Sequence, residues 1–533
     1  MSGYILAAAA IILVCLLLSK LSGRMGVPTL ALFILLGMLV GSDGLLKIHF
    51  DDFIVSGNIC TIALIFIIFY GGFGTNWNHA RHVAVKATLL SSLGVVLTAV
   101  LTGGFCHYVL GIGMLESILV GAIISSTDAA SVFSILRSKK LSLKYGTSSL
   151  LEVESGSNDP FSYMMTVIVL SAMKGNFDGA NLLLMIVQQV FLGVAFGAAA
   201  GLLSAKMLSR FRMSAEGFDT IFVFGVTLIT YAGADYTGGN GYLSVYILGI
   251  ILGNQPIQNK KNLVHFFDGV TGLMQILVFF LLGLLSFPSQ LPQIFFPALC
   301  IALFLTFIAR PLAIFLLLSP FRCPVKQQLL VSWAGLRGAA SIVFAIMATV
   351  DSAHMHNDIF HITFLIVLFS IFTQGSLIPF MANKLDMIDL NSNVMKTFND
   401  YSDEIQLQFI QISIFKDHPW ADMQIKDMNI IPDLLIVMIL RDGERIIPNG
   451  NTRIMPGDMV IITAMSANTD STFLLTEMKI DGDSEWIDQS LEEINLGKEC
   501  LIIAIKRKDA IVIPRGKTSI RKDDVLITCK ALL

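Results

Sequence analysis

Charge is scarce in this sequence. Of its 533 residues, 14% are charged and 54% are hydrophobic, whereas about 25% of residues are charged in an average soluble domain. The mean hydropathy of +0.73 excludes a purely water-soluble fold, because the interior of such a fold could not bury that much apolar surface. The charged residues are distributed unevenly. Residues 1–385 hold 20 Lys and Arg and 15 Asp and Glu, whereas residues 386–533 hold 16 Lys and Arg and 24 Asp and Glu. We therefore expect a polytopic membrane domain followed by an acidic soluble domain, and the acidic charge argues against nucleic acid as a partner.

Several functional motifs are also missing. The seven cysteines form no Cys-x-x-Cys pair, so we expect reduced thiols that pack as small hydrophobic groups. The sequence has no His-Glu-x-x-His zinc motif and no Gly-x-Ser-x-Gly nucleophile motif, which argues against a membrane-embedded enzyme. It also lacks a selectivity-filter loop of the Thr-Val-Gly-Tyr-Gly type. A potassium channel gated by the soluble domain is therefore the alternative hypothesis and not the leading one.

Thirteen apolar segments lie within residues 1–385. Most of them have the roughly 20 residues needed to cross the hydrocarbon core of a membrane, and the shortest is 241–254. The first segment follows no basic residue, so we interpret it as a span and not as a signal peptide. The sequence therefore predicts about 13 transmembrane helices. The segments are residues 3–20, 27–46, 54–74, 84–110, 114–136, 146–173, 181–208, 218–235, 241–254, 263–287, 294–318, 327–350 and 359–383.

Basic residues are distributed unequally between alternate loops. One set of loops holds 16 Lys and Arg, and the other set holds only Lys47 and Lys174. Because cytoplasmic loops are enriched in Lys and Arg, we expect a multi-pass protein of the cell inner membrane, with its N-terminus outside and its C-terminal domain in the cytoplasm. The 16 residues are Lys20, Arg24, Arg81, Lys86, Arg137, Lys139, Lys140, Lys144, Lys206, Arg210, Arg212, Lys260, Lys261, Arg322, Lys326 and Lys384.

A few charged residues fall at membrane depth. An ionisable group costs free energy there, so each one is a candidate functional residue. Three further carboxylates, Asp219, Asp235 and Asp268, lie near segment ends, where solvation or helix capping is expected. The candidates within the apolar segments are Asp128, Glu152, Glu154, Asp159, Arg310 and Arg337.

Asp159 lies in a polar run, Glu-Ser-Gly-Ser-Asn-Asp-Pro at residues 154–160. On a helix, Ser155 and Asp159 share a face. Pro160 cannot donate a backbone hydrogen bond to the carbonyl of Gly156, which leaves that carbonyl available. A carboxylate, a hydroxyl and a carbonyl make an oxygen-lined site that suits a small cation or a proton. The alternative is a buried carboxylate that only fixes helix packing.

Asp128 and Arg337 interrupt two apolar segments. Asp128 follows Ser-Ser-Thr, and Arg337 lies in Gly-Leu-Arg-Gly-Ala-Ala-Ser. Interrupted spans in corresponding places of two halves indicate discontinuous helices that cross at mid-membrane. Asp128 would then neutralise helix N-terminal ends and Arg337 helix C-terminal ends, which carry partial charges. Close helix packing alone would explain the small residues but not the charges.

Glu154 and Arg310 are natural partners for each other. Each would be costly in a membrane alone, and pairing is how buried charges are tolerated. Glu152 has two interpretations, a second pairing residue or a residue near the cytoplasmic end of its span.

These motifs resemble those of the monovalent cation:proton antiporters of the NhaP/NHE kind. The resemblance covers residues 1–385 and rests on four motifs in order. It implies an NhaA-like α-helical fold with inverted repeats, two discontinuous crossed helices, a homodimer and elevator-like alternating access. The motifs are Ser-Thr-Asp at 126–128, Glu-Ser-Gly-Ser-Asn-Asp-Pro at 154–160, Ala-Arg-Pro at 309–311 and Gly-Leu-Arg-Gly-Ala at 335–339.

The same resemblance implies roles for individual residues. Asp159 would bind the cation and the proton in turn, and Thr127, Ser155 and Asn158 would help to build the site, with Asp128 close to it. Having Asn158 instead of Asp before Asp159 resembles the electroneutral branch of these antiporters. Glu154 would pair with Arg310, and Arg337 would serve the crossed helices. We expect exchange of K⁺, or alternatively Na⁺, for H⁺, with no cofactor and with membrane lipid as surroundings.

The acidic tail contains an internal repeat. Residues 420–464 and 486–530 align without a gap at a spacing of 66, with fourteen identities in 45 positions. Each copy predicts a short helical stretch, an apolar strand, a turn and a final strand after an Asp turn. The tail is therefore expected to be an α+β domain made of two copies of one module.

The repeat resembles two RCK-C (TrkA-C) modules, which we place at residues 401–467 and 468–533 after a linker at 386–400. Such modules accompany potassium channels and transporters, which favours K⁺ as the cation. No Gly-x-Gly-x-x-Gly precedes them, so the nucleotide-binding half of a full RCK unit is absent. A nucleotide-type regulatory ligand is one hypothesis, and a dimerisation domain without a ligand is the other.

Overall fold

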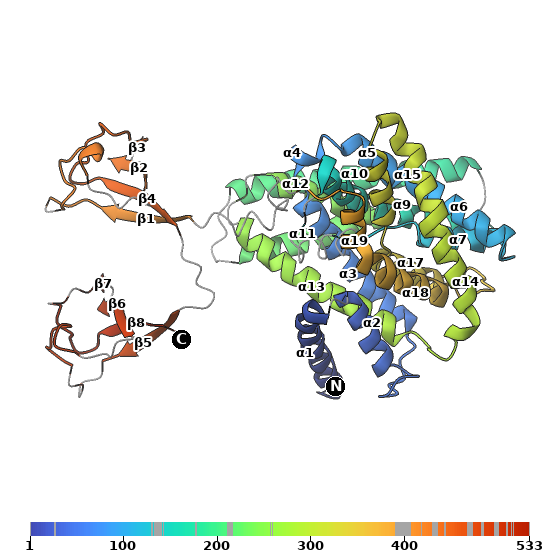
Figure 1. Cartoon of the computed structure of the whole chain (residues 1–533), viewed down its shortest axis with the longest axis horizontal. Coiled ribbons are helices and arrows are strands. Elements are labelled where there is room, and N and C mark those ends of the chain that lie inside the picture. Colours follow the sequence, from blue (N-terminus) through green and yellow to red (C-terminus); the bar gives the residue numbers. More distant parts are fainter. Residues whose placement is uncertain are drawn as a thin grey trace. The chain divides into compact units, whose positions relative to one another are not determined.

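The computed structural model divides into two compact units, residues 1–402 and 403–533. In Figure 1 the first unit consists of helices and the second consists mainly of strands. The structure describes residues 2–25, 28–128, 132, 141, 143–175, 179–210, 217–255, 257, 260–389, 407–416, 418–428, 435–441, 444–465, 473–480, 484, 486–494, 500–507, 510–512, 514, 516 and 518–531.

The first unit contains helix in each of the thirteen predicted apolar segments. The helices are α1 (Ser2–Met25), α2 (Thr29–Val40), α3 (Phe53–Gly74), α4 (Trp77–Ala80), α5 (Ala84–Leu89), α6 (Val95–Tyr108), α7 (Met114–Ile123), α9 (Thr147–Met173), α10 (Gly179–Arg210), α11 (Phe218–Tyr236), α12 (Gly241–Asn254), α13 (Lys260–Leu284), α14 (Leu291–Phe304), α15 (Arg310–Leu318), α16 (Val325–Trp333), α17 (Ala339–Val350), α18 (Ile359–Phe369) and α19 (Ser376–Lys384).

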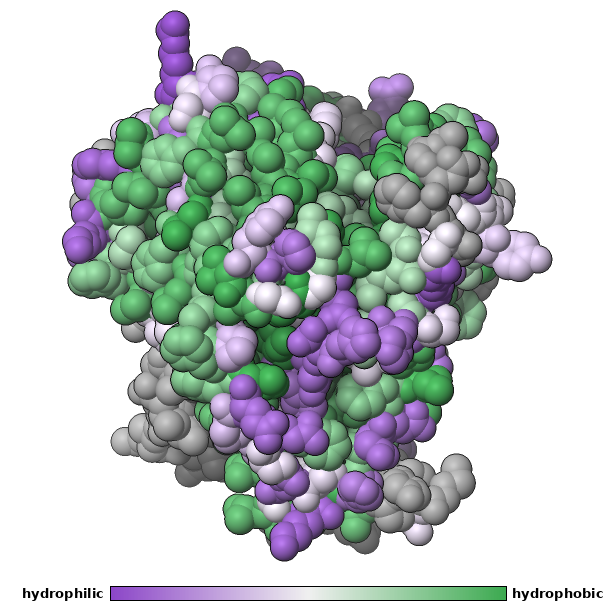
Figure 2. Space-filling view, turned by 90° about the vertical axis from the view of Figure 1, so that its right-hand side faces the viewer, coloured by the Kyte–Doolittle hydropathy of each residue, from purple (hydrophilic) through white to green (hydrophobic). Residues whose placement is uncertain are grey.

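Seven of the described helical stretches are long and apolar enough to cross a membrane, and the longest of them, Leu291–Phe321, has 31 residues. Other apolar helices, such as α12, are shorter. Hydrophobic side chains, green in Figure 2, cover much of the face shown there. The first unit is therefore a polytopic helical membrane domain, as predicted, whereas the number of thirteen spans stays a prediction.

Glycines let several helices pack backbone against backbone. A Cβ atom added at Gly37 of α2 would lie 2.2 Å from the carbonyl oxygen of Phe280 in α13, and one at Gly283 would lie 2.1 Å from that of Ile34. Any side chain at either position would therefore push α2 and α13 apart. Small residues at helix contacts are typical of membrane proteins, where close van der Waals packing drives association.

A π-helical turn interrupts the long helix that carries Arg310. The turn spans Leu305–Ala309 between α14 and α15, and the Arg310 N–H bonds to the Leu305 carbonyl. Pro311 follows directly and has no N–H to continue the regular α-helical ladder. Such turns often mark functional sites, and this one directly precedes the buried Arg310.

The second unit contains two four-stranded antiparallel sheets with the same topology, β1-β4-β2-β3 and β5-β8-β6-β7. Strand β2 carries a bulge between Ile436 and Met438, and β6 carries one between Ile502 and Ala504, 66 residues further on. The leading strand of each sheet, β1 or β5, was not predicted. The strands are β1 (Leu407–Ser413), β2 (Leu435–Arg441), β3 (Glu444–Ile446), β4 (Met459–Met465), β5 (Phe473–Lys479), β6 (Cys500–Arg507), β7 (Ala510–Val512) and β8 (Val525–Ala531).

Each sheet has a matching bidentate ion pair. The Arg441 guanidinium donates to both carboxylate oxygens of Asp458 at 2.7 Å, and Arg507 donates to Asp524 at 2.9 and 2.7 Å. Both carboxylates are buried. The linker at 386–400 and the outer limits of the predicted modules fall mostly on residues outside those that the structure describes, so these boundaries stay predictions.

Candidate functional site

The chain after the end of α7 meets the break between α16 and α17. Helix α7 ends at Ile123, and residues 126–128 are not helical, whereas α16 ends at Trp333 and α17 begins at Ala339. The backbone N–H of Asp128 donates to the carbonyl of Leu336 at 2.8 Å. The non-helical backbone after α7 therefore contacts the non-helical backbone between α16 and α17.

Arg337 binds the end of α7. Its Nη1 atom donates to the carbonyl oxygens of Ser125 at 2.9 Å and Ser126 at 2.8 Å. These carbonyls follow the last turn of α7, where the helix dipole concentrates partial negative charge. The Arg337 N–H also donates to the hydroxyl of Ser370 at 3.0 Å. The buried guanidinium therefore lies against the C-terminal end of α7.

Asp128 lies at the other half-helix. A Cβ atom added at Gly338, the N-cap of α17, would lie 2.4 Å from Asp128 Oδ2. The carboxylate therefore sits beside the N-terminus of α17, whose free N–H groups favour negative charge. The glycine is required for this approach, since any side chain would displace the carboxylate.

Helix α9 presents three polar side chains to the break after α7. The Ser155 hydroxyl donates to the Thr127 carbonyl at 2.7 Å, and the Asn158 amide donates to the Thr127 hydroxyl at 2.5 Å. The Ser126 hydroxyl donates to the Asp159 carboxylate. The structure thus brings Thr127, Ser155, Asn158 and Asp159 together. Ser126 was not among the predicted site residues, although its place beside Thr127 in a hydroxyl-rich break could have indicated it.

One oxygen at this site has no partner. Asn158 is 1% exposed, and its Oδ1 atom accepts no hydrogen bond from the residues that the structure describes. A buried acceptor left unpaired costs free energy unless something else binds it. Together with the Asp159 carboxylate on the same helix, it supplies oxygen atoms of the kind that coordinate small cations.

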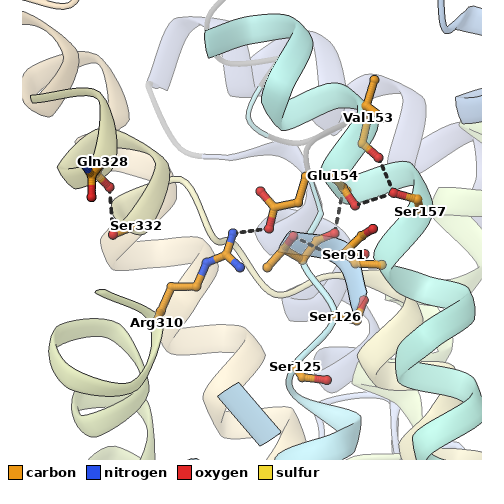
Figure 3. A network of polar contacts seen from close by, with 12 residues as sticks. Ser91, Ser125, Ser126, Val153, Glu154, Ser157, Arg310, Gln328 and Ser332 are labelled. Carbon is orange, nitrogen blue, oxygen red and sulfur yellow. Dashed lines mark hydrogen bonds and ion pairs between the residues drawn. The ribbon is translucent and has the colours of Figure 1, made fainter. Parts of the chain in front are cut away.

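Glu154 and Arg310 form an ion pair. In Figure 3 the Arg310 guanidinium on α15 and the Glu154 carboxylate on α9 point toward each other. Their side chains are 3% and 1% exposed, respectively. A Cβ atom at Gly335 would lie 2.9 Å from Arg310 Nε, so the break before α17 also makes room for the arginine. The pair joins α9, with its Asp159, to the helix that carries the π turn.

Glu152 and His361 are two further ionisable residues of this unit. Glu152 is half-buried on α9, two residues before Glu154. His361 is held by Asp358, with 2.6 Å between Nδ1 and Oδ2, and its Nε2 accepts the N–H of Phe287 at 3.0 Å. Among the residues that the structure describes, no group of three His, Cys, Asp or Glu side chains could hold a metal ion.

Both units match families of known proteins. The family described as sodium/hydrogen exchanger, transmembrane, matches residues 9–384, and the TrkA-C domain matches residues 409–473 and 475–527. The K⁺/H⁺ antiporter NhaP of Alkalimonas amylolytica is 34% identical over 87% of this chain and 81% of its own length. The K⁺/H⁺ antiporter NhaP2 of Shewanella sp. (strain MR-4) is 32% identical over 86% of this chain and 81% of its own length.

A solved structure has the same fold. The sodium proton antiporter MjNhaP1 from Methanocaldococcus jannaschii at pH 8 superposes with a TM-score of 0.64, over 72% of this chain and 99% of that chain, at 24% identity. The exchanger family also matches most of the chain. The chain belongs to the sodium/hydrogen exchanger family, as a cation:proton antiporter of the NhaP type, which is a transporter and not an enzyme.

Proposed function

We propose that this chain exchanges K⁺, in preference to Na⁺, for H⁺ by alternating access, with Asp159 as the carboxylate that binds the cation and the proton in turn. One observation carries the proposal: Asp159 is bonded to Ser126 at the crossing of two interrupted helices, and the unpaired Oδ1 atom of Asn158 belongs to the residue before it. Thr127 and Ser155 hold this arrangement in place.

The proposed mechanism needs one titrating carboxylate. Protonated Asp159 and cation-bound Asp159 are both neutral, so both forms can move between a state open to one side and a state open to the other. The empty carboxylate is an anion, which is costly to carry through a low-dielectric barrier, so uncoupled leak is suppressed. Competition of the two ions for one site makes the exchange one-for-one and electroneutral, in keeping with Asn158 at the preceding position.

Charge compensation supports the crossing in this proposal. Asp128 neutralises the N-terminus of α17, and Arg337 neutralises the end of α7. Glu154 and Arg310 keep α9 attached to α15 without leaving a net charge. We further propose thirteen spans in inverted repeats, a homodimer, and a location in the cell inner membrane with the N-terminus outside and the tail in the cytoplasm, in agreement with the distribution of Lys and Arg between loops.

Two findings favour K⁺. The relatives with 32–34% identity are named K⁺/H⁺ antiporters, and TrkA-C modules follow the membrane domain. The test uses purified protein in liposomes that contain a pH-sensitive dye and carry an imposed proton gradient. Addition of K⁺ should dissipate the gradient at a lower concentration than addition of Na⁺, and the rate should not change with an imposed membrane potential. A channel would instead move K⁺ without moving protons.

The tail is proposed to regulate exchange. Its two modules match TrkA-C domains, and a nucleotide-type ligand is the proposed effector. Deletion of residues 400–533 should leave exchange in place and change its dependence on pH or on added nucleotide. If the truncated protein keeps the same rate profile as the full chain, the modules have no regulatory role and act at most in assembly.

A further inference from the structure

One buried hydroxyl group close to the candidate site has no partner. Tyr246 lies on α12 and is 3% exposed, and its hydroxyl makes no hydrogen bond to the residues that the structure describes. Thr75 at the end of α3 lies near this hydroxyl, but the Thr75 hydroxyl donates instead to the carbonyl of Gly71 at 2.9 Å. A buried polar group without a partner costs free energy, so its presence requires an explanation.

The Tyr246 hydroxyl lies against the helix that carries Asp159. A Cβ atom added at Gly156 of α9 would lie 3.1 Å from the Tyr246 hydroxyl oxygen and 2.7 Å from its ring atom Cε2. Gly156 and Asp159 are three residues apart, and such residues are neighbours on a helix surface, with about 5–6 Å between Cβ positions. The hydroxyl therefore lies within one helical turn of Asp159, across the contact between α9 and α12.

Other oxygen atoms on the same turn of α9 also lack donors. Pro160 has no N–H, so the Gly156 carbonyl lacks the hydrogen bond that an α-helix normally supplies. The Asn158 Oδ1 atom accepts no hydrogen bond from the residues that the structure describes. Carbonyl, hydroxyl and carboxylate oxygens from two helices are consequently gathered around Asp159. Groups of such oxygens replace the water shell of a monovalent cation in ion-conducting proteins.

The helix that carries Tyr246 is packed tightly against α3. A Cβ atom added at Gly72 of α3 would lie 2.4 Å from the carbonyl oxygen of Tyr246, and one at Gly249 of α12 would lie 2.4 Å from that of Phe69. Any side chain at either glycine would push the two helices apart. The backbone position of Tyr246 is therefore fixed by α3, and its hydroxyl approaches Asp159 from a helix outside the crossing.

We propose that the Tyr246 hydroxyl is a further ligand of the transported monovalent cation. The carboxylate of Asp159 binds the cation from α9, and the phenol oxygen binds it from α12. A proton forms an O–H bond with the carboxylate and needs no second ligand, so Tyr246 serves the cation and not the proton. The inference rests on the proposed function of Asp159, and it adds a residue from outside the crossing to the site.

A role in packing alone makes a different prediction. If the Tyr246 ring only fills the space over Gly156, its hydroxyl is an unpaired buried group, and its removal should leave exchange unchanged. If the hydroxyl binds the cation, its removal should weaken cation binding and leave proton binding as it was. The two roles are therefore separated by the KM for the cation and by the dependence of that KM on pH.

The test is Tyr246→Phe, which keeps the ring and removes only the hydroxyl. In proteoliposomes the KM for K⁺ should rise about three- to tenfold, as for the loss of one favourable contact to a charged group, with little change in the maximal rate. Because only cation binding is weakened, the rise should have the same factor at every pH measured. Tyr236→Phe is the matched control, since Tyr236 is 94% exposed, and its KM should stay unchanged.

Thermal unfolding in detergent provides a readout that does not depend on transport. K⁺ should raise the unfolding midpoint of the unmodified protein by binding its folded state, and the same K⁺ concentration should raise that of Tyr246→Phe by less. Without K⁺, the midpoint of the variant should be no lower than that of the unmodified protein. A lower midpoint without K⁺, together with an unchanged response to K⁺, would assign the hydroxyl to folding and overturn the proposal.

Two transport results would also overturn the assignment of Tyr246. One is an unchanged KM in Tyr246→Phe while the unmodified protein exchanges K⁺ for H⁺, which leaves the proposed function standing. The other is a rise in KM at acid pH alone, which would place the hydroxyl in proton binding. If the unmodified protein exchanges no cation for protons in the same liposomes, the proposed function fails, and the assignment of Tyr246 fails with it.

Discussion

The Asn158 amide nitrogen lies 2.5 Å from the Thr127 hydroxyl oxygen. This hydrogen bond joins α9 to the non-helical backbone that follows α7, and the Asn158 Oδ1 atom accepts no hydrogen bond from the residues that the structure describes. Because Asp159 follows directly, the bond also restricts where the carboxylate can lie. The position of the candidate cation site thus depends on contacts between a helix and a broken helix.

Removal of the Thr127 hydroxyl should weaken cation binding. Thr127→Val leaves the Asn158 amide without its acceptor in a buried site, which costs about 1–3 kcal/mol. We expect the KM for K⁺ in proteoliposomes to rise about tenfold, since about 1.4 kcal/mol corresponds to a factor of ten. Thr127→Ser keeps the hydroxyl and should keep a KM near that of the unmodified protein. Equal KM values for the two variants would show that the hydroxyl takes no part in the site.

Removal of the Glu154 charge should destabilise the protein, because Arg310 is buried. Glu154→Gln leaves the guanidinium without a counter-charge, which costs about 3–5 kcal/mol for a buried pair. The thermal unfolding midpoint of the detergent-solubilised protein should fall accordingly. The matched control is Glu152→Gln, the same change on the same helix at a half-buried position, which should have a much smaller effect.

The double variant Glu154→Leu with Arg310→Met completes this experiment. It removes both charges and should recover most of the stability that Glu154→Gln loses. A double variant that is less stable than either single variant would contradict the interpretation of the pair as mutual neutralisation.

A single methyl group should disturb the crossing. Gly338→Ala places a Cβ atom 2.4 Å from Asp128 Oδ2, so either the carboxylate or the start of α17 has to shift, at a cost of about 1–3 kcal/mol. Exchange and thermal stability should both fall. At Gly225 of α11, in contrast, no described residue beyond the local helix backbone has an atom within 4 Å of an added Cβ, and Gly225→Ala should leave both unchanged or raise the stability slightly. Similar losses in the two variants would contradict the close approach of Asp128.

The soluble modules should lose stability in acid. Hydrogen bonding from the Arg441 guanidinium lowers the pKa of Asp458 below its ordinary value, and Arg507 does the same for the pKa of Asp524. Because the folded pKa lies below the unfolded value of about 3.9, the pairs contribute stability that is present above about pH 4 and is lost as the pH falls through the folded pKa.

Amide hydrogen exchange of the full chain measures this loss. After correction for the intrinsic rate, exchange in β4 and β8 should accelerate as the pH falls below about 4. Asp458→Asn should accelerate exchange in β4 already at neutral pH and leave β8 unchanged, whereas the exposed Asp427→Asn should change neither strand. Unchanged exchange of β4 in Asp458→Asn would mean that the ion pair does not stabilise its sheet.

The features that could be predicted from sequence were those with a local cause. Apolar runs predicted the helices. Charges within those runs singled out Asp159, Arg310 and Arg337 as candidates, because an ionisable group at membrane depth costs free energy. The repeat at a spacing of 66 predicted two like modules. The strands β1 and β5 were missed because they precede the region where the two copies remain similar.

Other features depend on which helices meet. The hydrogen bond of Ser126 to Asp159 joins residues 33 positions apart in the sequence, and no periodic pattern links them. The unpaired oxygen of Asn158 likewise becomes visible only after all of its neighbours are in place.

The measurement that tests the central claim most directly is cation-dependent proton movement in proteoliposomes that contain Asp159→Asn. The substitution keeps the size of the side chain and removes both its charge and its ability to exchange a proton. Asp268→Asn, a carboxylate near the start of another helix that accepts a bond from Tyr70, serves as the control. We predict that Asp159→Asn abolishes the response to K⁺ and to Na⁺ while Asp268→Asn retains it. Full exchange in Asp159→Asn would contradict the account.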